Sequence, residues 1–182
     1  MRCGRYYRPS AIRTLSLDGH GVDVRGARAH APSMFSQVPA MTGIRSHIRS
    51  LECYVERCGG CVVRESLPEA IHGGQSRDCI TLHAGLDPYQ QLLALVHELT
   101  HWLAHRDAPQ DLSACTTIYE YEAEAVESLV MGRLGLPCPT DGAAAARWNC
   151  PTDGLLTSSV ARVVSTVRRI CQALELEQDG AN

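Results

Sequence analysis

The stretch of sequence that decides the fold is DPYQQLLALVHELTHWLAH, residues 87–105. Asp87 followed by Pro88 is typical of a helix N-terminus, and Gln90 stands where the partner of a capping box belongs. Apolar residues recur downstream at helical spacing, so we predict a helix over residues 88–106. The predicted core stripe of this helix consists of Leu92, Val96, Leu99 and Leu103.

A His-Glu-x-x-His pattern lies inside this predicted helix, from His97 to His101. Residues four apart on a helix differ by about 40° and one turn, so both imidazoles project from one face toward a common point. Zinc is commonly held by two histidines in this arrangement. Glu98 lies about 100° round from His97 and suits a carboxylate that takes a proton from a metal-activated water. We therefore predict one zinc ion per chain, bound by His97 and His101, with Glu98 as the catalytic residue.

A catalytic zinc site usually has three protein ligands and a water. The residues after His101 lack the Gly and His of the extended metzincin pattern, which leaves a carboxylate as the expected third ligand. A helix predicted from about Thr117 to Leu134 carries Glu120, Glu124 and Glu127 in one narrow stripe between apolar residues. Burying these carboxylates would be costly without a cation, so we predict Glu120 as the metal ligand. Glu124 would orient a ligand histidine, a solvated acidic face being the alternative for both, and Glu122 is expected on the surface.

Further side chains are candidates for supporting roles around the metal. His105 lies one turn beyond His101 on the same helical face, where it could orient a ligand or a substrate carbonyl. Tyr119 and Tyr121 are candidate donors to a developing oxyanion, and the sequence does not choose between them. Cys58-Gly-Gly-Cys61 has the spacing of half a structural zinc site, but no second pair completes it, so incidental thiols are the favoured interpretation.

The remaining pattern predicts an α+β domain. A helix is expected from Thr42 to Gly59, followed by short strands at residues 61–63 and 79–82 that form a small sheet. A loop is expected over residues 137–156, and a C-terminal amphipathic helix begins near Ser158 or Ser159.

Composition bounds the class of protein. The 182 residues are 45% hydrophobic, which suffices for one domain, expected at residues 41–182. All 17 basic residues are Arg, and eight of them lie in the first 50 positions, so residues 1–40 are predicted to form an Arg-rich flexible arm. The net charge of −3 does not suggest a dedicated nucleic-acid or membrane binder. Without a signal peptide or an 18-residue apolar run, we expect a cytoplasmic protein whose nine cysteines are reduced.

Residues 92–105 and 120–126 together resemble the ImmA/IrrE-type metallopeptidases and, similarly, the peptidase domain of ArdC-type antirestriction proteins. The family pattern of Glu, two variable residues, Ala and an acidic or amide residue maps onto Glu120, Ala123 and Glu124. The resemblance covers roughly residues 79–136. It implies a zincin-like metallopeptidase fold, with a small sheet packed on the His-Glu-x-x-His helix and a Glu-bearing helix. It also implies that an edge strand, expected at residues 79–82, pairs with an extended substrate.

The resemblance implies a zinc metallopeptidase acting on a protein or peptide, with DNA-binding regulators among the candidate substrates. The chain shows no helix-turn-helix pattern, and its first 50 residues are too short for an ArdC-like single-strand-binding domain. A second hypothesis is a zinc-stabilised interaction module that binds a transcription factor or nucleic acid through the arm. A third is a non-proteolytic hydrolase that uses the same metal and base.

Overall fold

A computed structural model describes residues 5–7, 38–106, 113–138 and 153–175, with side chains described for residues 43–106, 118–138 and 157–175. Among these residues, no helix is both long and apolar enough to span a membrane. The helices are α1 (Val38–Arg57), α2 (Pro88–Ala104), α3 (Ser113–Arg133) and α5 (Asp153–Glu175). The strands are β1 (Arg5–Tyr7), β2 (Cys61–Glu65), β3 (Gly73–Gln75) and β4 (Cys79–His83).

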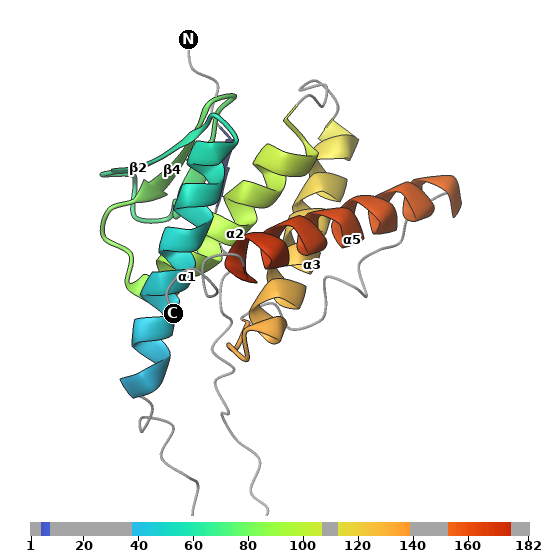
Figure 1. Cartoon of the computed structure of the whole chain (residues 1–182). Helices are drawn as coiled ribbons and strands as arrows, with labels where there is room; N and C mark the ends of the chain where they lie inside the picture. The colour runs from blue at the N-terminus through green and yellow to red at the C-terminus, as the bar shows by residue number, and fades with distance from the viewer. Residues whose placement is uncertain (1–4, 8–37, 107–112, 139–152, 176–182) are drawn as a thin grey trace, which may run out of the picture.

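Helix α2 is the centre of the fold. It begins at the predicted capping box, in which the Asp87 side chain accepts from the Gln90 amide and the Gln90 side chain accepts from the Asp87 amide. Every residue from Leu92 to Trp102 is buried, including the polar ones, because α2 packs against the sheet and against α1, α3 and α5. Figure 1 shows α2 between the sheet and α3, with α5 crossing in front. Side chains on α2 are therefore held rigidly from all sides.

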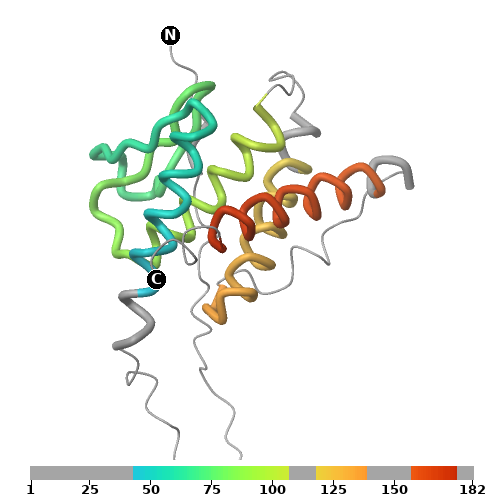
Figure 2. Tube along the Cα trace, in the orientation of Figure 1, coloured from blue at the N-terminus to red at the C-terminus, as the bar shows by residue number. Residues whose placement is uncertain are grey.

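The sheet has the strand order β1-β3-β4-β2. Strands β2 and β4 run parallel, whereas β3 is antiparallel to β4 and β1 is antiparallel to β3. The burial of β4 alternates, and its fully buried residues Ile80 and Leu82 belong to the same core cluster as Leu51 and Val55 of α1 and the apolar residues of α2. Strands β3 and β4 both contact α2, so the sheet lies against the helix that carries His97 and His101. The path of the chain through these layers can be followed in Figure 2.

The predicted helices and two of the strands are present, with shifted ends. Helix α3 begins at Ser113 rather than near Thr117, and α5 begins at Asp153 rather than near Ser158. Most of the predicted loop 137–156 lies outside the described residues, and its last part belongs to α5. The α+β class is therefore confirmed.

Two predictions about strands are wrong. Residues 79–82 do not form an edge strand, because β4 is paired on both sides, by β2 and by β3. Part of the predicted arm, Arg5–Tyr7, is a strand that pairs with β3, while residues 1–4 and 8–37 lie outside the described residues. Both differences come from β3, whose Gly-Gly-Gln sequence has almost no β propensity and gives no strand signal.

The cysteines of β2 and β4 correct the expectation of reduced thiols. Cys61 and Cys79 stand directly opposite each other in the parallel register, with their Cα atoms 4.6 Å apart, and they form a disulfide. This separation lies in the usual range for disulfides. Cys58 is a free, exposed cysteine, so the Cys58-Cys61 pair is not half of a zinc site.

Candidate metal centre

His97, His101 and Glu120 converge on one point between α2 and α3. The two Nε2 atoms of the histidines are 3.1 Å apart. The Glu120 carboxylate approaches Nε2 of His97 at 3.2 Å and Nε2 of His101 at 3.4 Å. Among the described residues, these three side chains bring their donor atoms close enough together to hold a metal ion. The three ligands predicted from the sequence are therefore brought together.

The spacing of these donor atoms fits zinc. Zinc–nitrogen bonds of 2.0–2.1 Å in a tetrahedral site place neighbouring ligand atoms about 3.3 Å apart. The observed separations of 3.1–3.4 Å match that edge length. His97 and His101 are only 1% and 3% exposed, whereas the Glu120 side chain is 44% exposed. The centre is thus closed on the α2 side and open to solvent beside α3, as a catalytic metal site requires.

The charges of these three side chains are set by the same contacts. Burial by itself lowers the pKa of His97, but hydrogen bonds to Glu120 and Glu127 raise it to about 9. Burial lowers the pKa of His101 to about 4. Burial raises the pKa of Glu120, yet hydrogen bonds with both histidines bring it well below its usual range. His97 is therefore protonated in this network and carries the positive charge that faces Glu120 and Glu127.

Glu98 lies beside the ligands and is 1% exposed. Its Oε1 is buried and has no hydrogen-bond partner within the described part of the chain. Burial raises the pKa of Glu98 to about 8. A buried carboxylate oxygen without a partner is costly, and it marks a position that a ligand or substrate group completes. The backbone of Gly73 in β3 lies against this side chain, because a Cβ atom there would come within 3.0 Å of Glu98 Cγ.

Glu127 orients His97. Nδ1 of His97 is 3.2 Å from Oε2 of Glu127, and both side chains are fully buried. Nδ1 of His101 faces His105 instead, at 3.1 Å. The sequence predicted an orienting role for the half-buried Glu124, and Glu127, one turn further along α3, has this role toward His97. Glu127 lies two turns from Glu120 on the same stripe, so the signal for it was present in the sequence.

His101 is supported by a chain of polar groups that ends on α5. His105, predicted to support the site, sits at the end of α2, and its Nε2 is 2.7 Å from Oε2 of Glu122. Glu122 in turn receives two hydrogen bonds from Arg162, at 2.6 and 3.0 Å. If Nε2 of His101 binds a metal, its Nδ1–H donates to His105, and His105 donates to Glu122. The hydrogen positions follow from this network.

The surface position predicted for Glu122 is wrong. Its side chain is 1% exposed and also accepts a hydrogen bond from Ser159. Burial raises its pKa, but His105, Arg162 and Ser159 together lower it to about 2, so Glu122 is ionised. The helical pattern of α3 alone could not reveal this, because the counter-charge comes from α5, 40 residues away in sequence. Ser159 and Arg162 were not expected at the site for the same reason.

Tyr119 was a candidate oxyanion donor, and its ring stacks on His105 with centroids 4.3 Å apart. It therefore helps to fix the polar chain behind His101. Tyr121 is half-buried, and nothing in the structure assigns it an oxyanion role.

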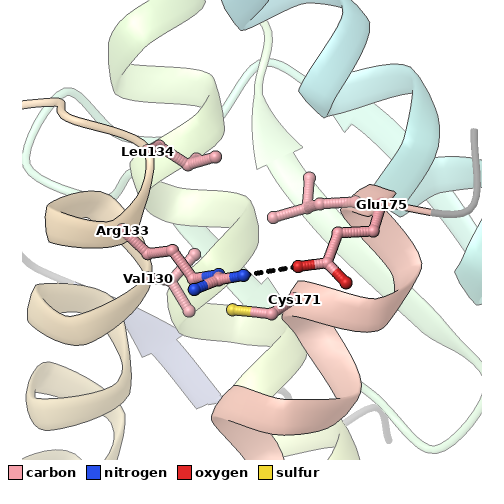
Figure 3. A pocket seen from close by; sticks show the side chains of 6 residues that line it. Val130, Arg133, Leu134, Cys171 and Glu175 are labelled. Atoms are coloured by element: carbon pink, nitrogen blue, oxygen red, sulfur yellow. Dashed lines mark hydrogen bonds and ion pairs between the residues drawn. The ribbon is translucent and has the colours of Figure 1, made fainter. Parts of the chain in front are cut away.

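A recess between α3 and α5 lies far from this centre. Figure 3 shows it bridged by an ion pair of 2.6 Å between Arg133 and Glu175. The α3 residues that line it, Val130 and Arg133, follow Glu120 by ten or more positions, or about 15 Å along the helix axis. This recess is not part of the metal centre.

Comparison with known proteins gives an independent result. No curated protein and no solved structure gives a significant match. A family model, Peptidase_M78, described as the IrrE N-terminal-like domain, matches residues 56–148, which include α2, α3 and all three potential metal ligands. This span is half of the chain, and it points to a metallopeptidase in general terms. The chain belongs to the Peptidase_M78 family, whose model describes the IrrE N-terminal-like domain.

Proposed function

We propose that this chain is a zinc-dependent peptidase of zincin-like fold. His97, His101 and Glu120 would hold one Zn²⁺, and Glu98 would act as general base. The observation that carries the proposal is the triangle of donor atoms, 3.1–3.4 Å apart, beside a buried Glu98 oxygen that has no partner among the described residues. The family match supports the peptidase class.

The arrangement of elements also supports the proposal. The helix that carries the two histidines packs under a sheet whose strand β3 runs antiparallel to its neighbour and contacts that helix. The third ligand comes from the next helix, α3. An extended peptide bound along the outer side of β3 would then pass close to Glu98, because the Glu98 side chain packs against the backbone of Gly73.

The residues divide the chemistry between them. Zinc, when bound, supplies a Lewis acid that polarises a carbonyl and increases the acidity of water. Glu98 would accept the proton of the attacking water and deliver it to the leaving amine nitrogen. Its burial matters because exclusion of bulk water raises the pKa of the carboxyl group, which makes the ionised carboxylate a stronger proton acceptor than an exposed one. Glu127 and His105 hold the two imidazoles in place.

The ligand set is tested by zinc content. Elemental analysis of purified protein should find about one zinc per chain in the wild type. Glu120→Ala should lose it, and Glu124→Ala should keep most of it. A folded wild type that neither contains zinc nor takes it up would remove the basis of the proposal.

Catalysis is tested separately with zinc-loaded protein and a proteome-derived peptide library, scored by mass spectrometry for new N-termini. Glu98→Gln should abolish cleavage while keeping zinc. Glu56→Gln is the matched control, because Glu56 is exposed on α1. Cleavage that persists in Glu98→Gln would refute the role of Glu98. Zinc binding without any cleavage would favour an interaction module or a hydrolase with a different substrate.

A further inference from the structure

Strand β3 packs against Glu98 through the backbone of Gly73. The hydrogen bonds between β3 and β4 decide which amides face the outer edge of β3. The Ser76 amide donates to the Cys79 carbonyl at 2.8 Å, and the His83 amide donates to the His72 carbonyl at 2.9 Å. Because such pairs alternate along an antiparallel ladder, His72, Gly74 and Ser76 face β4. The amides and carbonyls of Gly73 and Gln75 therefore face the opposite side.

That side is taken by β1. Tyr7 stands opposite Gly73, and Arg5 stands opposite Gln75, in antiparallel register. The same alternation makes these the two hydrogen-bonded pairs, while the Tyr6 amide faces away from β3. Strand β1 also contacts α2. The segment Arg5–Tyr7 thus lies as an added strand along the backbone that packs against Glu98.

An extended peptide that added itself to β3 would need the same groups. An antiparallel peptide would hydrogen-bond to Gly73 and Gln75, and its backbone would run past Glu98. Both strands cannot use one edge, since each outward amide and carbonyl of β3 forms a single ladder bond. Occupation by β1 and occupation by a substrate are therefore mutually exclusive.

We propose that the outer edge of β3 is a strand-docking surface whose resident occupant is the chain's own segment Arg5–Tyr7, and that this segment competes with an extended peptide substrate. The competition with a substrate rests on the proposed peptidase function, whereas the docking of Arg5–Tyr7 on β3 does not. Release of β1 opens the edge. A partner that captured the N-terminal segment would thereby activate the enzyme.

The size of the effect follows from effective concentration. A tethered segment acts at roughly 1 mM, and a short strand-forming peptide is expected to bind with a Kd of about 0.1 mM. The tethered strand then weakens the binding of a competing peptide by about tenfold. The competition should raise KM and leave kcat nearly unchanged, because β1 is displaced from the edge once the substrate is bound.

Two proline substitutions in the full-length chain form a matched pair. Tyr7→Pro removes an amide that bonds to β3, so β1 should detach. Tyr6→Pro removes an amide that points away, which an edge strand tolerates. In hydrogen exchange, the Gly73 and Gln75 amides should exchange at least about tenfold faster in Tyr7→Pro than in Tyr6→Pro. Equal protection in the two variants would overturn the assignment of β1 to this edge.

Binding is measured with a fluorescein-labelled peptide of residues 2–10, its cysteine replaced by serine, on zinc-loaded protein that carries Glu98→Gln to prevent turnover. Fluorescence anisotropy should show about tenfold tighter binding to Tyr7→Pro than to Tyr6→Pro. Equal affinities would overturn the competition.

Activity separates this inference from the function on which it rests. With active zinc-loaded protein, KM for a cleaved peptide should be about tenfold lower in Tyr7→Pro than in Tyr6→Pro. If no variant cleaves any peptide, the peptidase proposal fails, and the exchange and binding results still decide whether β1 occupies the edge. If both variants cleave with equal KM, the competition is refuted and the peptidase proposal stands.

Discussion

Replacing Glu127 by Gln should weaken zinc binding by about 10- to 100-fold, or about 1.4–2.7 kcal/mol. Oε2 of Glu127 is 3.2 Å from Nδ1 of His97, and neither side chain is exposed to more than 1%. Gln keeps the size and an acceptor oxygen but removes the negative charge that makes the imidazole a stronger ligand. The measurement is a competition titration of metal-free protein against a chromophoric zinc chelator at constant pH.

Glu124→Gln is the control, because it makes the same chemical change one turn earlier on α3. Its zinc affinity should stay within about threefold of the wild type, since the ligand histidines are oriented by Glu127 and His105. Circular dichroism of both variants establishes that α3 is still folded. If Glu124→Gln lost more affinity than Glu127→Gln, the assignment of the orienting carboxylate would be wrong.

Three other perturbations test different contacts. Arg162→Ala leaves the buried Glu122 carboxylate without its guanidinium partner. Because Arg162 is about one-third exposed, we expect the free energy of unfolding of the metal-free protein in urea to fall by about 2 kcal/mol, and an unchanged midpoint would contradict this. Zinc affinity should rise about tenfold per pH unit up to about pH 9, because the proton on His97, with its pKa of about 9, must leave before zinc binds. Calorimetry in buffers of different ionisation enthalpy should detect the released proton, and a zinc affinity that does not change with pH would argue against it. Gly73→Ala should lower kcat/KM by at least about tenfold with zinc content intact, because its Cβ would displace Glu98; unaltered kinetics would show that the strand yields instead.

The candidate metal ligands and the helix that carries the two histidines could be predicted because they depend on local geometry. A spacing of four places His97 and His101 on one face of any helix, and the capping residues Asp87 and Gln90 fix where that helix begins. Glu120 followed from the cost of burying a carboxylate without a cation. These inferences need only the residues of one helix and elementary electrostatics.

The supporting groups depend on elements that the local pattern does not place. Glu122 looked like a surface residue because Arg162, which makes its burial tolerable, lies on a helix that packs across α3. Strand β3 was missed because glycine carries no periodic signal, and its role is to let α2 approach closely. With β3 unseen, the pairing of Arg5–Tyr7 could not be anticipated either.

The interface between α2 and α3 has a further consequence for how the fold is specified. Three carboxylates of α3, those of Glu120, Glu122 and Glu127, each meet a histidine of α2. Apolar helix faces slide past one another at small cost, but a shift of one helical turn here would leave buried charges without partners. The histidine–carboxylate pairs therefore favour a single register of α3 against α2, and they do so without a bound metal.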